Sequence, residues 1–339
     1  MLSGALLSAC SASTPVATPA TTTKPSLTTT TPTTTPVPTT TTTTLPTPPS
    51  GWTLASVGPR GITALTKTVV GSAGAHITVA EFPAATTAFH LHVGTTDPPG
   101  ATSISPNDAG ASVSAYELSL LIAAFNGGFK KADAKGGVMV DGTVVSPLVT
   151  GAASAVIDAN GSLHVGSWGV TIPTTKERVT SVRQNLTLLV SGGKVEPTAA
   201  NPALWGSTIG SNPAVARSAL GVDASGNVFF LGSMAALPLE LAQTMATLGV
   251  SQGMQLDINP NWITLGISMF PGGQLMGEVP GQQHSPSIFI GGWQRDFLAV
   301  LALPPRNCRL VFPAPPMVAA ANPPAVVCGS PGIQPRSSR

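Results

Sequence analysis

Asp257 is the first candidate for a catalytic residue in this chain. It ends the apolar run MQLD and precedes the turn INPNW, in a sequence with only 9% charged residues. A β-strand over residues 254–258 would place Gln255 and Asp257 on the face opposite the apolar side chains. The carboxylate then lies at the end of a strand, where ligand sites commonly form. A turn-capping aspartate is the structural alternative, and the sequence leaves both open.

Two further segments place polar groups beside apolar runs. Asn126 is followed by Gly127 and Gly128, whose missing side chains let the backbone approach a ligand or a neighbouring segment. An Asn-Gly helix C-cap is the alternative. Arg217 precedes the apolar run SALGV, and a buried guanidinium suits a carboxylate or phosphate partner. A structural salt bridge would also satisfy Arg217.

Cleavage of a glycosidic bond usually needs two carboxyl groups, one as proton donor and one as nucleophile or base. Asp257 is the first candidate, and Asp296, beside Arg295, is the second. Asp141 could replace Asp296, although Asp141-Gly142 is also typical of a hairpin turn.

Three histidines are weaker candidates. His90 and His92 lie on one face of an expected strand, a spacing that can hold a metal ion. No third ligand follows in the sequence, so we predict no metal site. The sequence requires no cofactor, although a divalent cation is compatible with it. His284, in GQQHSPS, either lines the site or lies on the surface.

These residues are expected to sit on a single α+β domain with a mixed, largely antiparallel sheet and at least two helices. Short apolar runs alternate with turns in which Gly, Asn or Asp can adopt the positive φ that hairpins need. Four hairpins are predicted, with turns at Asp141-Gly142, Ala159-Asn160-Gly161, Gly192-Gly193 and around Ser225-Gly226.

Apolar residues at helical spacing predict two helices. The first covers residues 114–125, where Ser114 and Glu117 have capping-box spacing. The second covers residues 237–248, with Pro238 in its first turn and Gly249 at its C-terminal stop.

Three segments, in this order, resemble the phosphodiester glycosidase family: Asn126-Gly127-Gly128-Phe129, Arg217-Ser218 and Leu256-Asp257. The resemblance extends over about residues 76–300, and HLHVGTTDPPG and GGWQRDFLAV are similar to a form found in bacterial lipoproteins. It implies hydrolysis of a glycosidic bond to a phosphodiester, with Asp257 as acid or nucleophile. Arg217 would neutralise the phosphate or orient a carboxylate, and Asn126, with Gly127 and Gly128, would position the sugar.

The turn after Asp257 departs from the family pattern. The family has Gly-Gly-Gly-Ser where this chain has INPN. Consecutive glycines can offer backbone N–H groups to an anion, but Pro260 has no N–H to offer. Trp262 offers instead a flat apolar face for a sugar ring, and Asn259 can bond its hydroxyls. The turn therefore resembles the rim of a sugar site with a remodelled phosphate cradle.

The first 50 residues are expected to lie outside this domain. MLSGALLSAC ends in a sequence that resembles a lipobox, which predicts a signal remnant over residues 1–10 and a lipid on Cys10. No basic residue precedes Cys10, so we expect the natural start to lie upstream. A chance cysteine is the alternative. Residues 11–50 contain 19 Thr and 9 Pro, a composition typical of a disordered, extended linker.

The catalytic domain is expected over residues 51–303, followed by a Pro- and Ala-rich tail over 304–339. If Cys10 is acylated, Cys308 and Cys328 remain and can form a disulfide in an oxidising compartment. Two free thiols are the alternative.

The predicted function is hydrolysis of a sugar phosphodiester or a related cell-envelope glycan linkage. The alternatives are a noncatalytic glycan-binding lipoprotein and a structural envelope protein. The expected location is extracytoplasmic, either anchored to the bacterial membrane through Cys10 or secreted. The net charge of +2 forms no basic stripe, which excludes nucleic acid as an expected partner.

Overall fold

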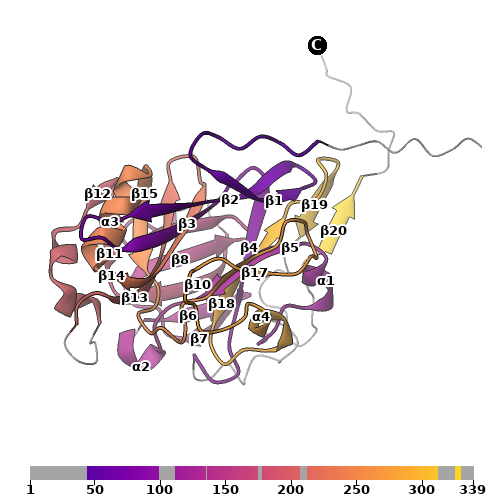
Figure 1. Cartoon of the computed structure of the whole chain (residues 1–339). Coiled ribbons are helices and arrows are strands. Elements are labelled where there is room, and N and C mark those ends of the chain that lie inside the picture. The colour runs from indigo at the N-terminus through magenta and orange to yellow at the C-terminus, as the bar shows by residue number, and fades with distance from the viewer. Residues whose placement is uncertain are drawn as a thin grey trace, which may run out of the picture. The chain divides into compact units, whose positions relative to one another are not determined.

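The computed structural model describes residues 44–98, 111–134, 136–174, 178–206, 212–311 and 325–329. These residues form three main β-sheets and a two-stranded ribbon (Figure 1). Every strand pair among them is antiparallel. The only parallel contact in these ranges is an isolated bridge between Trp168 and Ile172. The predicted fold class, largely antiparallel sheet with a few helices, is confirmed.

The eight-stranded sheet carries the longest hairpin and the longest helix. Its strands are, in spatial order, β1 (Thr53–Gly58), β2 (Gly61–Val70), β3 (His76–Phe82), β14 (Val228–Ala236), β13 (Val215–Asp223), β15 (Val250–Gln255), β11 (Leu188–Ser191) and β12 (Lys194–Val195). Helix α3 (Pro238–Thr247) packs on one face through Leu241, Ala242 and Met245, which are fully buried. The helix predicted over residues 237–248 is therefore present.

The second sheet consists of five strands from the middle of the chain. They are, in spatial order, β7 (Thr143–Ser146), β6 (Val138–Val140), β10 (Val179–Asn185), β8 (Ala153–Asp158) and β9 (Leu163–Ser167). The β6–β7 turn uses positive φ at Asp141 and Gly142, and the β8–β9 turn uses it at Gly161. All four hairpins expected from the sequence are present.

The third sheet contains part of the segment predicted as the first helix, so that prediction is wrong for residues 121–125. Its strands are, in spatial order, β17 (Met276–Gly277), β16 (Leu265–Ile267), β5 (Leu121–Asn126), β18 (Phe297–Ala302) and β4 (Thr87–His92). Helix α1 (Ala115–Leu118) has the predicted capping box between Ser114 and Glu117, but the chain then enters β5. Every residue of β5 is buried, and a continuous apolar run reads alike as a buried strand or a buried helix. Asn126 consequently ends a strand, and it does not cap a helix.

The main core lies where the three sheets face one another. Phe82 of β3 contacts Phe89 of β4 and Phe125 of β5, with ring centroids 6.1 and 6.0 Å apart. Phe125 also contacts Phe230 of β14 at 5.0 Å. Each fully buried phenylalanine contributes about 1.5–3 kcal/mol of transfer free energy. This aromatic cluster joins the first and third sheets and so fixes the strand ends that carry the polar residues described below.

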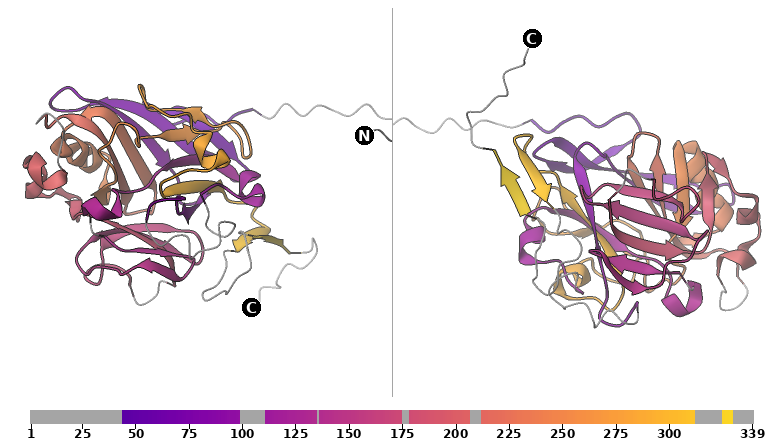
Figure 2. Two further views of the ribbon diagram at one scale, coloured as in Figure 1. Left: turned by 90° about the horizontal axis from the view of Figure 1, so that it is seen from below. Right: turned by 180° about the vertical axis from the view of Figure 1, so that it is seen from behind.

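The remaining short elements lie outside the sheets. They are α2 (Lys131–Ala134), α4 (Ile288–Gly291), and the 3-10 helices η2 (Pro197–Ala200) and η3 (Pro202–Trp205). The ribbon of β19 (Cys308–Val311) and β20 (Ala325–Cys328), in yellow in Figure 2, lies on the side of the sheets away from α3. A disulfide joins Cys308 to Cys328 across it.

Leu45–Arg339 group into one compact unit. No helix in the described ranges is long and apolar enough to cross a membrane. Cys10 and residues 11–43 of the linker predicted over residues 11–50 lie outside the described residues, so the lipid anchor stays a prediction.

Candidate functional site

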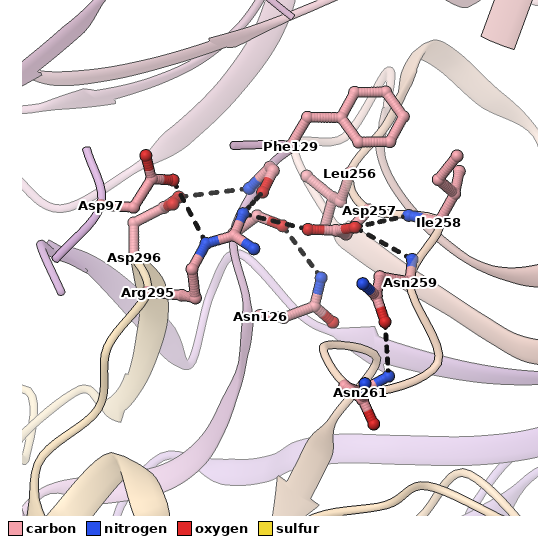
Figure 3. A network of polar contacts seen from close by, with 12 residues as sticks. Asp97, Asn126, Phe129, Leu256, Asp257, Ile258, Asn259, Asn261, Arg295 and Asp296 are labelled. Atoms are coloured by element: carbon pink, nitrogen blue, oxygen red, sulfur yellow. Dashed lines mark hydrogen bonds and ion pairs between the residues drawn. The ribbon is translucent and has the colours of Figure 1, made fainter. Parts of the chain in front are cut away.

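Two aspartates are brought together by backbone pairing that continues beyond the strands. Past the end of β15, the N–H of Leu256 donates to the carbonyl of Ser218 at 2.8 Å, and the Ser218 N–H donates to the carbonyl of Asp257 at 2.9 Å. Asp296 immediately precedes β18, and its carbonyl accepts from the N–H of Gly127 at 2.9 Å. The first and third sheets thus each deliver one carboxyl group to the same cluster (Figure 3).

Asp257 is buried, with 3% of its surface exposed. Its Oδ1 accepts from the N–H groups of Ile258 and Asn259, at 2.7 and 3.0 Å, which folds the following turn back on the carboxylate. Its Oδ2 accepts from Nη2 of Arg295 at 3.1 Å. Burial raises the pKa of Asp257 to about 6, although Arg295 and the two N–H donors act in the opposite direction. The group is therefore poised to change its charge just below neutral pH.

Asp296 forms a two-pronged ion pair with Arg183 on β10. The Nε of Arg183 donates to Oδ2 at 2.7 Å, and its Nη2 donates to Oδ1 at 3.2 Å. The N–H of Gly128 donates to the same Oδ2 at 3.2 Å. Burial lowers the pKa of Arg183, but the charge and hydrogen bond of Asp296, together with the charges of Asp97 and Asp257, outweigh burial, and the net shift is upward. Both oxygens of Asp296 are thus held by the protein.

Arg295 contacts Asp257, Asp97 and the backbone of Gly128. Its Nη2 donates to Asp257 and, at 2.8 Å, to the carbonyl of Gly128, while its Nε lies 3.2 Å from Oδ2 of Asp97 (Figure 3). The residue is 4% exposed, and within the described ranges its Nη1 has no hydrogen-bond partner. A buried N–H donor without a partner is costly, so it marks a position where an acceptor from a ligand would be stabilised.

The two glycines are required by this arrangement. A Cβ on Gly127 would overlap the carboxylate of Asp296, and a Cβ on Gly128 would lie 3.1 Å from Cζ of Arg183. The glycines therefore make room for the protein's own acid and arginine, in addition to any role toward a ligand.

Three aromatic rings form a cluster that contacts Arg295 through Trp262. Its guanidinium carbon lies 5.1 Å from the ring centroid of Trp262, which Lys130 also approaches, at 5.8 Å. The Trp262 ring stacks at 6.5 Å with His284, and both rings contact Trp293, at 5.5 and 4.9 Å. Trp262 and His284 are half-buried, so both keep accessible surface.

The other residues predicted for the site are engaged with the protein itself. Asn126 donates to the carbonyl of Gly127 and to the hydroxyl of Ser218, and its Oδ1 accepts from the N–H of Thr264. Asn259 accepts from the N–H of Asn261 at 3.0 Å. Both asparagines brace the loops around Asp257.

Arg217 has partners different from those expected. It is fully buried and donates to the carbonyls of Ala236, Trp205 and Pro213 and to the side chain of Gln255. Burial lowers its pKa to about 10. Among the described residues it has no carboxylate partner, and the arginines that pair with Asp257 and Asp296 are Arg295 and Arg183.

Residues 119–257 match the family model described as phosphodiester glycosidase. The match covers 139 of the 339 residues of the chain. The match includes Asn126, Arg183 and Asp257, but it ends before Arg295 and Asp296, which complete the cluster in space. No curated protein matches the chain.

Solved structures similar to this chain share little sequence with it. The catalytic domain of zebrafish N-acetylglucosamine-1-phosphodiester alpha-N-acetylglucosaminidase, auto-inhibited by its pro-peptide, is 15% identical, with a TM-score of 0.44 over 74% of this chain and 87% of that chain. A hypothetical protein from Synechocystis is 14% identical, with a TM-score of 0.38 over 70% and 62%. A putative exported protein from Burkholderia pseudomallei is 14% identical, with a TM-score of 0.34 over 73% and 76%.

Asp97, Arg183, Asp257, Arg295 and Asp296 form an acid–arginine cluster, and three of these residues are not predicted from the sequence. Arg183 lies in the unremarkable segment SVRQN, and Asp97 lies in a loop, while Arg295 was noted only as the neighbour of Asp296. Each pairs with a residue far away along the chain, as Arg183 does with Asp296. The only sequence signal for these residues is that charged residues are rare in this chain. A charged residue that is buried requires a partner, so each of the few is a candidate for an ion pair.

A second polar cluster forms around His90 and His92 of β4. His90 Nδ1 lies 2.5 Å from Oε1 of Glu117, and His92 Nε2 lies 3.1 Å from the same oxygen. His90 Nε2 lies 3.1 Å from Oδ1 of Asp141. Burial disfavours the charged form of His90, but the charges of Asp141 and Glu117 outweigh it and raise the His90 pKa well above its usual value. Asp141 is therefore a neighbour of His90, away from the contacts of Asp257.

Proposed function

We propose that the domain hydrolyses the glycosidic bond between a sugar and a phosphodiester. The observation that carries this proposal is the buried Nη1 of Arg295, which has no hydrogen-bond partner in the described ranges and belongs to the same guanidinium that pairs with Asp257. An anionic oxygen of the substrate would complete the hydrogen bonds of Arg295, and a guanidinium suits phosphate. Lys130, near the same tryptophan face, adds a second positive charge.

The chemistry of such a substrate assigns the role of Asp257. Cleavage of the anomeric C–O bond of a sugar phosphodiester releases a phosphate monoester, whose second pKa is about 6, so the leaving group needs charge neutralisation more than it needs a proton. Arg295 supplies that charge, and catalysis then requires a carboxylate that attacks the anomeric carbon or activates water. With a pKa of about 6, Asp257 is ionised at neutral pH. Its raised pKa also makes it a stronger base than an ordinary aspartate, which suits a general base or a nucleophile. Asp296 and Arg183 hold Gly128 and Arg295 in place around it.

The sugar would lie against Trp262. Aromatic side chains offer large apolar faces, and this one lies 5.1 Å from the guanidinium carbon of Arg295. His284, stacked on the same ring, would bond a hydroxyl of the sugar. The aromatic face and the guanidinium together fit a substrate with one apolar ring face and one adjacent anion.

The test is hydrolysis of an N-acetylglucosamine-1-phosphodiester by the purified chain, followed as release of free sugar. Activity in the wild type that is lost in Asp257→Asn supports the proposal. Equal activity in both proteins removes Asp257 from the chemistry. Arg306→Lys, which changes an exposed arginine of the tail, serves as the control for handling and stability.

A noncatalytic glycan-binding function is the second candidate. The specific observation in its favour is that the N–H groups of Ile258 and Asn259 already donate to Asp257, and Pro260 has none. This turn therefore leaves fewer backbone donors for a phosphate than a glycine-rich turn would. Sugar-phosphate binding by calorimetry without turnover, equal in the wild type and Asp257→Asn, would favour this function.

An extracytoplasmic location is supported by the Cys308–Cys328 disulfide, because disulfides persist in oxidising compartments. We further propose that Cys10 carries a lipid that tethers the domain to a membrane through the Thr- and Pro-rich linker. Mass spectrometry of the mature N-terminus tests this, and an unmodified Cys10 in the protein isolated from cells would contradict it.

A further inference from the structure

We propose that His90, His92 and Glu117 form a binding site for a divalent transition-metal ion of the zinc type. These three residues lie outside the stretch that matches the glycosidase family, and the proposed hydrolysis does not use them. The inference is independent of the proposed function.

The first argument is the convergence of the donor atoms. One nitrogen of each imidazole and one carboxylate oxygen lie within 4.8 Å of one another, and all three residues are buried. Both nitrogens approach the same oxygen, Oε1 of Glu117. Ligands about 2.0–2.2 Å from a tetrahedral zinc ion would be roughly 3.3 Å apart, so a small outward shift of Glu117 accommodates the ion.

The second argument is that each ligand side chain is held in place by a further contact, on the side away from the proposed ion. His90 directs Nδ1 at the cluster, while its Nε2 lies 3.1 Å from the carboxylate of Asp141. A metal-binding histidine typically donates its other N–H to a carboxylate in this way. The Oε2 of Glu117 accepts from the Ser114 N–H at 3.0 Å, so the capping box of α1 also fixes the carboxylate.

His92 is oriented by packing. Its ring stacks on Phe297 with centroids 4.6 Å apart and planes inclined by 4°. Phe297 is paired with His92 across β4 and β18, so the stack is part of the sheet register. The ligand rotamers are therefore set before any ion binds, which lowers the cost of binding.

The ligand set indicates the class of metal. Two imidazoles and one carboxylate suit zinc and its neighbours in the first transition series, whereas calcium and magnesium prefer oxygen ligands alone. The ion would tie together β4, α1 and the β6–β7 hairpin, three segments that are distant in sequence. Because β6 pairs with β10, which carries Arg183, the ion would also stabilise one wall of the acid–arginine cluster.

The test uses the full chain, stripped of metal with a chelator and then titrated with Zn²⁺ in a calorimeter at neutral pH. We expect one equivalent to bind, with a rise in melting temperature of about 5 °C at saturating zinc. His92→Ala should abolish binding, whereas His76→Ala, which changes an exposed histidine on β3, should leave it unchanged.

Removal of His92 from the core also tests folding, so a second variant separates the two effects. The Asp141 side chain is 20% exposed and would orient His90 without touching the ion. Asp141→Asn should keep the fold and weaken zinc binding about 10- to 100-fold. X-ray absorption of the wild-type zinc complex should show two imidazole ligands. Absence of zinc binding, a shell without imidazole, or equal affinities in Asp141→Asn and wild type would overturn the proposal.

Discussion

Arg295 and Asp257 form a buried ion pair, with Nη2 and Oδ2 3.1 Å apart, although they are separated by 38 positions along the chain. The same Nη2 donates to the carbonyl of Gly128, whose N–H donates to Asp296. Gly128 therefore links Asp296, through its N–H, to the Arg295–Asp257 pair, through its carbonyl. A change in any of these groups is expected to affect the others, because buried charged networks are strongly non-additive.

Arg295→Lys should weaken both substrate hydrolysis and phosphate binding. A lysine keeps the charge but lacks the planar fork that serves Asp257, Gly128 and a phosphate together. We expect kcat/KM to fall by about 100-fold, equivalent to about 2.7 kcal/mol, and inhibition by inorganic phosphate to weaken about 10-fold. Unchanged phosphate inhibition, beside an unchanged Arg306→Lys control, would contradict a role of Arg295 in phosphate binding.

The activity should depend on the ionisation of Asp257. Its pKa is raised to about 6 by burial. Because we assign the chemistry to the carboxylate form, kcat/KM should fall about tenfold per pH unit below pH 6 and level off above it. A pH–rate profile measured where the protein stays folded checks this. A rate that instead falls as the pH rises above 6 would assign Asp257 the role of proton donor.

The folding stability should depend on the ionisation of Asp257 in the opposite direction, because the folded chain favours the protonated carboxyl group. The pKa of Asp257 is higher in the folded chain, about 6, than its ordinary value of 3.8. The folded state therefore binds the proton more tightly, and the contribution of Asp257 is fully present below about pH 4 and lost as the pH rises through about 6. The free energy of unfolding should fall by about 3 kcal/mol across this window, and Asp257→Asn should remove that fall. Urea unfolding at pH 4, 5, 6 and 7 measures it.

Gly127→Ala should lower both the stability and the activity, because Gly127 lies directly against the Asp296 carboxylate. The added Cβ would overlap the Asp296 carboxylate, so the Arg183–Asp296 pair must shift or break. We expect a loss of about 3 kcal/mol in unfolding free energy and most of the activity. Gly291→Ala is the matched control, because a Cβ there meets nothing within 4 Å. Equal activity in the two variants would show that the close contact at Gly127 is dispensable.

Local sequence patterns predicted the hairpins and α3 well, because each depends on residues close together in the chain. The β6–β7 turn needs positive φ at Asp141 and Gly142, which these residue types supply. The α3 helix has Pro238 at its start and a left-handed Gly249 after its end. In both cases the local preference and the tertiary environment agree.

The sequence was less informative where the environment decides. LIAAFN has an apolar stripe compatible with a helix, but it is a strand because β16 and β18 supply its hydrogen bonds. Arg217 and Arg183 both sit in buried strands and both donate to backbone carbonyls, but only Arg183 also meets a carboxylate. Glu117 was identified as a capping residue, and only the fold reveals that it also meets two histidines. Such pairings across the chain have no local signal.

Trp262→Ala should weaken sugar binding more than it slows the chemical step. The ring lies beside the Arg295 guanidinium and keeps accessible surface for a sugar face. Loss of one aromatic contact of about 1.4 kcal/mol would raise KM about tenfold, and kcat should change by less than threefold. Phe270→Ala is the control, since Phe270 is 53% exposed and the described contacts do not place it near Asp257. A large fall in kcat at constant KM would mean that Trp262 acts by positioning Arg295, and that the sugar lies elsewhere.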